Sequence, residues 1–155
     1  MGFRITGLDA AQFRQLFAMS DEELRRRNSK RYVADAKPGF PCRITLEDAE
    51  PGETLILTNY RHQTASSPYA SQGPIFVRER EAPRAACVDE VPVQLTRRLV
   101  SLRAYDRCGM MIDADVAEGA GVKPLIERLL ADPQTDYVHA HFARRGCYAA
   151  LIERT

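Results

Sequence analysis

Two histidines, His139 and His141, are separated by a single residue in a segment that we predict to be a β-strand. Alternate side chains of a strand point to the same side, about 6.5–7 Å apart along it, a spacing that two ligands of one metal ion can use. The third histidine, His62, lies in a distant polar segment. Three histidines with an open coordination position suit a hydrolytic zinc or a non-haem metal, so a divalent metal is a candidate cofactor. The alternative is a sheet face whose histidines are satisfied by water and neighbouring side chains.

The polar segment that holds His62 is a second candidate site. It lies between two short apolar runs, 55–58 and 75–77, which we predict to be buried strands. The segment 59–73 contains Tyr60 and Tyr69 among many hydrogen-bonding side chains. Loops of more than about 12–15 residues without regular structure are uncommon and are usually functional or disordered. The segment therefore predicts a long ligand-binding loop, with a surface loop that packs on its own tyrosines as the alternative.

A basic and aromatic cluster could complete such a site. We expect Arg103 to face Asp113 across a hairpin, with Tyr105 beside them. An arginine held by a carboxylate next to tyrosines suits a small carboxylate or phosphate ligand, although ordinary cross-strand pairing would use the same residues. The candidate ligand-binding residues are Tyr60, His62, Tyr69, Arg103, Tyr105, His139 and His141. The sequence names no catalytic residue.

The four cysteines predict no local metal or redox motif. They are Cys42, Cys87, Cys108 and Cys147, and none forms a C-x-x-C pair. We expect four free thiols, most of them buried.

Two signatures predict N-terminal helices after an edge strand at 3–7. Asp9 with Gln12, and Ser20 with Glu23, have the spacing of capping boxes. Further strands are expected at 31–36 and at 42–47, and a connecting loop at 81–92. A helix is predicted at 124–132, because Pro124 can begin it and Pro133 follows it.

Two hairpins are predicted near the C-terminus, each closed by a three-residue loop that ends in glycine, at 107–109 and 144–146. The apolar pattern sets the expected pairs, which are Val100 with Val116, Leu102 with Ala114, Ala104 with Ile112, Val138 with Ile152, Ala140 with Ala150, and Phe142 with Tyr148. The histidines then lie on the opposite face from Val138 and Ala140.

These elements predict one α+β domain over residues 1–155, with a curved, mostly antiparallel β-sheet that could form a partly closed barrel. The chain has 22 basic and 21 acidic residues, and a net charge of +1 offers no general field for nucleic acid. No apolar run is long enough to span a membrane, which favours a cytoplasmic protein. Open sheet edges make a homodimer the expected assembly.

Several fragments resemble a known bacterial family, the domain of unknown function 1203 (DUF1203). They are Pro41-Cys42-Arg43, Ser67-Pro68-Tyr69-Ala70, Gly73-Pro74-Ile75-Phe76-Val77, Arg103-Ala104-Tyr105-Asp106 and Gly146-Cys147-Tyr148. The resemblance implies a stand-alone single-domain bacterial protein and lends no reaction, cofactor or catalytic residue. Three hypotheses follow: a binding module for a small polar or anionic ligand, a metal-dependent enzyme using His139 and His141, and a protein-interaction module.

Overall fold

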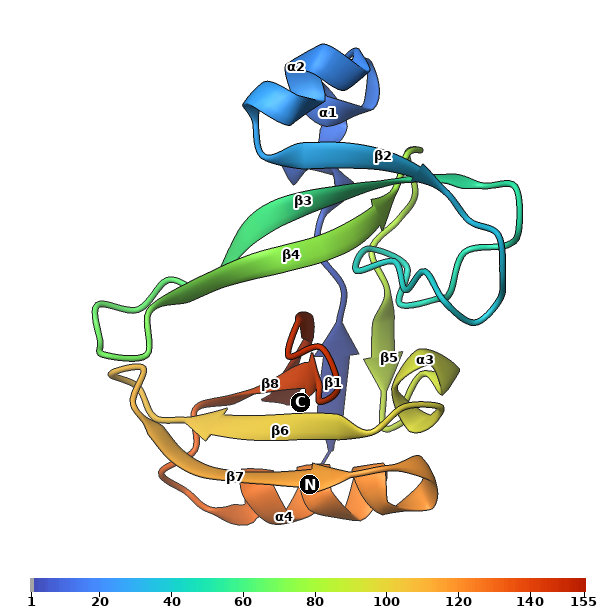
Figure 1. Cartoon of the computed structure of the whole chain (residues 1–155). Coiled ribbons are helices and arrows are strands. Elements are labelled where there is room, and N and C mark those ends of the chain that lie inside the picture. The colour runs from blue at the N-terminus through green and yellow to red at the C-terminus, as the bar shows by residue number, and fades with distance from the viewer. Residues whose placement is uncertain (1) are drawn as a thin grey trace.

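The computed structural model describes residues 2–155, and in this range nine strands form two antiparallel sheets (Figure 1). The larger sheet has the order β5 (Ala86–Val88), β1 (Phe3–Thr6), β9 (Tyr148–Arg154), β8 (Tyr137–Phe142), β6 (Val100–Tyr105), β7 (Met111–Ala117). The smaller sheet has the order β2 (Ser29–Val33), β3 (Thr54–Gln63), β4 (Ser71–Arg78). The predicted α+β class is confirmed, and neither sheet closes into a barrel within the described residues.

The helices are short. They are the 3-10 helices η1 (Ala10–Gln12) and η2 (Gly119–Gly121), and the α-helices α1 (Arg14–Phe17), α2 (Asp21–Arg26), α3 (Val93–Thr96) and α4 (Val122–Ala131). In Figure 1 α1 and α2 lie beside β2 of the smaller sheet, α4 lies along the larger sheet, and α3 lies near β5. The Ser20 side chain accepts a hydrogen bond from the Glu23 amide at 3.2 Å, so the predicted cap of α2 is present. The helix predicted at 124–132 corresponds to α4.

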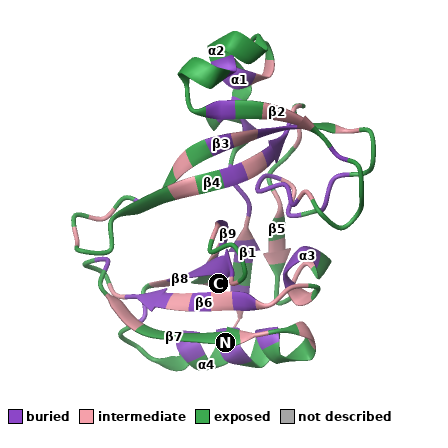
Figure 2. Ribbon diagram, viewed as in Figure 1, coloured by how far each residue is buried: buried purple, intermediate pink, exposed green. Residues whose placement is uncertain are grey.

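Two main apolar cores stabilise the arrangement. Leu125, Ile126 and Leu129 of α4 pack against Val138 and Ala140 of the larger sheet. A second core joins the N-terminal helices to β3 and β4. Figure 2 shows that β8 is mostly buried, whereas β3 and β4 are buried near one end and largely exposed or half-buried near the other.

Four predicted elements are wrong. The connecting loop predicted at 81–92 contains the strand β5, which pairs with β1. The segment 59–73 is not a long loop, because β3 continues to Gln63 and β4 begins at Ser71. The segment 42–47 is a turn with one isolated bridge, at Cys42, because the Leu46 amide donates back to the Cys42 carbonyl at 3.1 Å and Leu46 has a positive φ of 55°. The strand predicted at the sheet edge, β1, lies between β5 and β9.

The predicted register of the first hairpin is wrong, because the hairpin contains a bulge. Leu102 pairs with Asp115 and Ala104 with Asp113, and the register shifts before Tyr105.

In the second hairpin the predicted pairs Val138 with Ile152 and Ala140 with Ala150 are confirmed, and only the pair beyond the bulge is wrong. The register shifts after Ala140. As a result Tyr148 pairs with His141 and not with Phe142, which brings this tyrosine to the histidine face.

None of the described helices is both long enough and apolar enough to cross a membrane.

Candidate functional site

One face of the larger sheet is turned away from α4 and toward the smaller sheet (Figure 1). Because Val138 and Ala140 pack on the α4 side, the alternate residues His139 and His141 point to the opposite side. Arg103 of β6 pairs with His139 and lies on the same face. The alternation of β8 therefore positions two imidazoles and a guanidinium in the space between the sheets.

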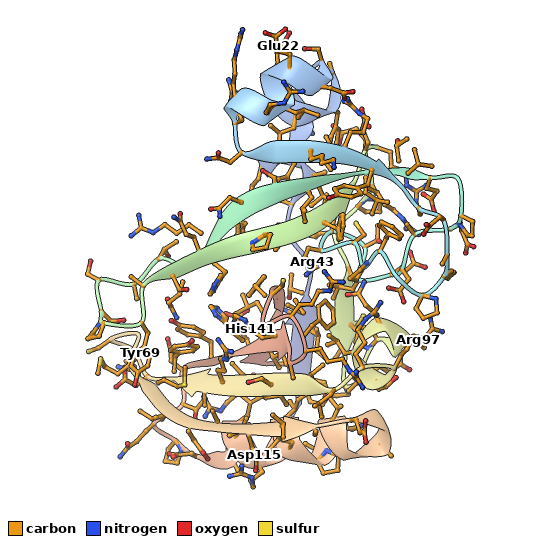
Figure 3. All side chains as sticks on the ribbon, viewed as in Figure 1. Glu22, Arg43, Tyr69, Arg97, Asp115 and His141 are labelled. Atoms are coloured by element: carbon orange, nitrogen blue, oxygen red, sulfur yellow. The ribbon has the colours of Figure 1, made fainter. Side chains whose placement is uncertain are left out.

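The third histidine reaches this space from the smaller sheet. His62 is near the end of β3, within a shift of the β3–β4 register between Tyr60 and Gln63. Its ring centroid is 4.8 Å from that of His141 and 6.3 Å from that of His139. One nitrogen from each of the three rings lies within 4.8 Å of the other two. All three histidines of the chain thus converge, and Figure 3 shows His141 between the two sheets.

Each of the three rings has one buried nitrogen without a hydrogen-bond partner in the described part of the chain. These atoms are Nδ1 of His62, Nδ1 of His139 and Nε2 of His141. Nδ1 of His141 lies 2.9 Å from the Gly146 carbonyl oxygen. A carbonyl only accepts, so Nδ1 donates this bond and Nε2 keeps its lone pair. Metal-bound histidines are oriented by a hydrogen bond of this kind.

The surroundings keep the three rings neutral. Burial lowers the pKa of His139 to about 3, and the neighbouring histidines and Arg103 act in the same direction. Burial also lowers the pKa of His141 to about 4, against the opposite effect of the hydrogen bond to Gly146. The pKa of His62 is lowered by burial and by Arg103. Neutral imidazoles are the form that binds a metal ion.

A hollow of about 300 Å³ adjoins the histidines. It is lined by His62, Gln63, Thr64, Ala65, Tyr137, His139, Leu151 and Glu153. The Gln63 amide nitrogen donates to the Tyr137 hydroxyl at 3.0 Å, which links the two sheets on this side. The hollow gives the histidine cluster space for a small molecule, with the Glu153 carboxylate at its wall.

Two of the predicted ligand-binding tyrosines lie beside the cluster. The Tyr105 ring centroid is 5.2 Å from that of His139, and burial raises the pKa of the Tyr105 hydroxyl. Tyr69 is on the β3–β4 turn, 37% exposed, with its ring 6.2 Å from that of Tyr105 (Figure 3). Tyr69 therefore lies at the solvent-exposed margin of the histidine cluster and packs against the Tyr105 ring.

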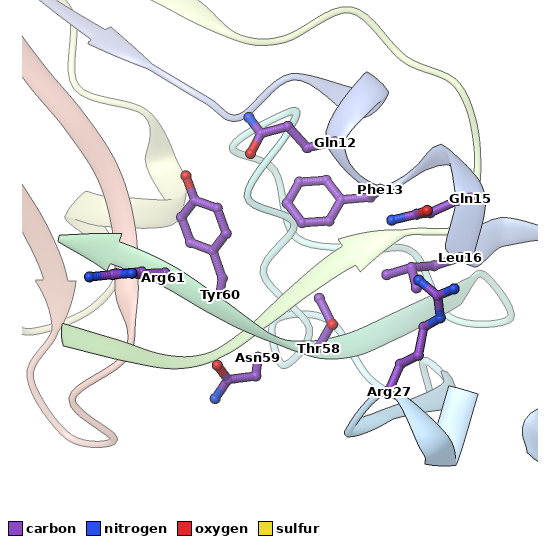
Figure 4. A pocket seen from close by; sticks show the side chains of 9 residues that line it. All are labelled: Gln12, Phe13, Gln15, Leu16, Arg27, Thr58, Asn59, Tyr60 and Arg61. Atoms are coloured by element: carbon purple, nitrogen blue, oxygen red, sulfur yellow. The ribbon is translucent and has the colours of Figure 1, made fainter. Parts of the chain in front are cut away.

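Tyr60 faces a different hollow, of about 350 Å³ (Figure 4). That hollow is lined by Gln12, Phe13, Gln15, Leu16, Arg27, Thr58, Asn59, Tyr60 and Arg61. The Tyr148 ring lies between this hollow and the histidine cluster. Its centroid is 5.9 Å from that of Tyr60 and 5.6 Å from that of His62. The structure thus separates Tyr60 from the other predicted site residues.

The predicted pair of Arg103 with Asp113 is wrong. The bulge in the hairpin turns Asp113 toward α4, where it pairs with Arg128 at 2.9 Å. Arg103 donates instead from Nε to the Ser101 hydroxyl at 3.3 Å.

The sequence did not indicate Tyr137 or Tyr148 as neighbours of the histidines. Tyr137 is two residues before His139, so strand alternation could have identified it. Tyr148 stacks on His62 at an interplanar angle of 10°, and burial raises the pKa of its hydroxyl. Its place depends on the bulge in the β8–β9 hairpin, which no local pattern of the sequence reveals.

The cysteines are free thiols, as predicted, but the expectation that most of them are buried is wrong, because Cys87 and Cys147 are only half-buried. Cys42 is buried and Cys108 is exposed. Cys147 is half-buried, and its thiol lies 3.9 Å from the Arg145 carbonyl oxygen.

A family model described as "Protein of unknown function (DUF1203)" matches residues 39–154. The matched range contains all three histidines and the strands that present them. No curated protein matches the chain, and no solved structure does.

Proposed function

The chain belongs to the DUF1203 family, whose function is unknown, and we propose that it binds one divalent transition-metal ion, zinc foremost, through His62, His139 and His141. The observation that carries this proposal is the set of three orphaned imidazole nitrogens in one enclosed cluster. Buried polar atoms in folded proteins nearly always have a partner. Among the described residues these three have none. Because one nitrogen of each ring also lies within 4.8 Å of the other two, a metal ion in the cluster would give the three rings a shared partner.

The spacing of the rings supports this ligand set. Zinc binds histidine nitrogens at about 2.0–2.1 Å in tetrahedral geometry, which places the nitrogens roughly 3.3 Å apart. The nitrogens here lie within 4.8 Å of one another, so closure by about 1.5 Å at most completes the site. Side-chain rotation supplies movements of this size.

The donor set favours a catalytic over a structural metal. Structural zinc sites have four protein ligands, whereas catalytic sites have three and leave a position for water or substrate. No fourth His, Cys, Asp or Glu joins the three histidines in the range 2–155. A zinc ion held in this way lowers the pKa of bound water to about 7. We infer a hydrolytic function, with the adjoining hollow as the substrate site.

The test is metal content in untagged protein purified without chelator, measured by native mass spectrometry and by elemental analysis. We expect one metal ion per chain in the wild type. The variants His62→Ala and His139→Ala each remove one ligand. We expect each to retain less than a tenth of the wild-type metal content. The control variant Cys108→Ser removes an exposed thiol that could bind zinc non-specifically. We expect this variant to keep the wild-type metal content. Full metal in the histidine variants, or no metal in wild-type protein supplied with zinc, would contradict the proposal.

The assembly and location stay predictions: a homodimer in the cytoplasm of a bacterium. Open strand edges support the dimer, since Val88 of β5 and Val116 of β7 are 49% and 54% exposed at the two edges of the larger sheet. Light scattering of the purified protein measures the mass in solution, and a monomeric mass would refute the dimer.

A further inference from the structure

Arg103 is a partly buried cation beside the three histidines that has no acidic partner. It pairs with His139 across β6 and β8, and its Nε donates to Ser101. Across residues 2–155, no carboxylate oxygen lies within 4 Å of its guanidinium. Charged groups that are removed from water are normally paired. The guanidinium of Arg103 is therefore available to an anion from outside the protein.

Other arginines in the interior have structural partners. Arg43 donates to the backbone carbonyls of Tyr148 and Pro41, at 2.9 and 2.6 Å. Arg78 lies 3.3 Å from a carboxylate oxygen of Glu53. These contacts give both side chains a partner within the protein. Arg103 in contrast has, within residues 2–155, only uncharged neighbours, the Ser101 hydroxyl that accepts from its Nε and the Tyr105 hydroxyl, and neither neutralises its charge.

The charge of the site points in the same direction. Three neutral imidazoles leave the full charge of a divalent ion uncompensated, and Arg103 adds another positive charge next to His139. This excess attracts a ligand that carries negative charge on oxygen. Carboxylates and phosphates offer two or more such oxygens, which can bridge a metal ion and a guanidinium. The hollow of about 300 Å³ that reaches His62 and His139 has space for a small molecule only, and Arg103, the cross-strand partner of His139, is not among the residues of its wall.

We propose that a small oxoanion, carboxylate or phosphate in class, occupies the open metal position and that Arg103 binds its second oxygen. This inference rests on the proposed metal site and specifies what that site recognises. A ligand that coordinates the metal lies above the larger sheet, on the face that Arg103 shares with His139 and His141. The arginine thereby selects anionic over neutral ligands.

The experiment uses protein loaded with Co²⁺, whose visible absorption changes when an anion enters the coordination sphere. Sodium phosphate and sodium acetate are titrated separately, and sodium chloride at equal ionic strength measures the effect of salt. In the wild type we expect a saturable spectral change with at least one of the two oxoanions, and the tighter one identifies the class.

The matched variants are Arg103→Gln, Arg103→Lys and Arg107→Gln, the last at an exposed residue of the adjoining turn. Arg103→Gln should bind Co²⁺ at least as tightly as the wild type, because a repelling charge is lost, and should bind the oxoanion about 10–100-fold more weakly. Arg103→Lys should be intermediate, and Arg107→Gln unchanged. Circular dichroism and the urea midpoint check that each variant is folded.

The outcomes separate the two proposals. If Co²⁺ binds but no oxoanion changes its spectrum, or if Arg103→Gln binds the oxoanion as the wild type does, the role of Arg103 is overturned and the metal site stands. If Co²⁺ does not bind to the three histidines at all, both proposals are overturned.

Discussion

At the scale of single residues, the chemistry of the site depends on which imidazole nitrogen is free. The Gly146 carbonyl fixes the tautomer of His141, and burial keeps all three rings neutral. Near neutral pH the metal-free cluster buries no charge on the imidazoles, and its cost is that of the three unpartnered nitrogens. In acid the histidines bind protons in the unfolded chain but stay neutral in the folded one. The metal-free protein is therefore less stable at low pH.

We predict that the free energy of unfolding of metal-free protein falls as the pH is lowered below about 6.5, the ordinary pKa of histidine. Folded His139 and His141 have pKa values of about 3 and about 4, so between these values and 6.5 the unfolded state binds more protons. Stability rises with pH wherever the unfolded state binds more protons. The histidine contribution is thus complete above pH 6.5 and is lost toward pH 4.

Urea unfolding in the presence of chelator, between pH 7.5 and 4.5, measures this slope. Because carboxylates also titrate in acid, the informative quantity is the difference between the wild type and His139→Leu. We expect a shallower slope in His139→Leu and the wild-type slope in the exposed control Cys108→Ser. Equal slopes in the wild type and His139→Leu would show that the folded state also protonates His139.

At the scale of elements, the tips of two hairpins hold the site closed at one end. The Ser67 hydroxyl of the β3–β4 turn donates to the Gly109 carbonyl of the β6–β7 turn at 2.9 Å. Gly109 has φ +75°, and a Cβ at this position would lie 2.2 Å from the Ala65 Cβ. This glycine is therefore required both by its backbone conformation and by the close approach of the other tip.

We predict that Gly109→Ala destabilises the protein more than Gly52→Ala does. Gly52 also has a positive φ, of +93°, but a Cβ there would have nothing within 4 Å. Gly52→Ala should cost only the left-handed conformation, about 1–2 kcal/mol, whereas Gly109→Ala adds overpacking of about 1–3 kcal/mol. Urea unfolding of both variants gives the comparison. Equal losses would mean that the tips separate at no cost.

The elements also show what local sequence patterns could and could not predict. The cap at Ser20 and the helix at 124–132 depend on neighbouring residues, and both were predicted. The strands through 59–63 and 71–73 were missed, because their polar residues are held by cross-strand pairing and not by an apolar pattern. The bulge in each C-terminal hairpin was missed for a similar reason: turn chemistry specifies the loop but not an extra residue several positions away.

At the scale of the whole molecule, the histidine cluster depends on how the two sheets pack. Strand alternation predicted that His139 and His141 share a face. Strand alternation could not predict that His62 lies near the other two histidines, because β3 and β8 belong to different sheets and do not pair with each other. The sequence could name His62 as a third ligand but could not predict that it meets the other two. Convergence of this kind follows only from the three-dimensional arrangement.

A metal ion bound by the cluster would join the smaller sheet to the larger one, so we predict that zinc stabilises the whole fold. A ligand that binds only the folded state at about 1,000 times its Kd adds about 4 kcal/mol to the free energy of unfolding. For a protein of this size that corresponds to a rise in melting temperature of roughly 8–16 °C. Differential scanning calorimetry with excess zinc and with chelator measures the shift.

The position of the ligands makes this prediction specific. His62→Ala and His139→Ala remove ligands from different sheets, and both should abolish most of the zinc-dependent shift while the chelated variants still unfold cooperatively. If His62→Ala kept the wild-type shift, the ion would be held by the larger sheet alone. An equal zinc-dependent shift in the wild type and in His139→Ala would mean that zinc acts at another place on the protein. Loss of the shift in both variants is the result expected of one ion that bridges the two sheets.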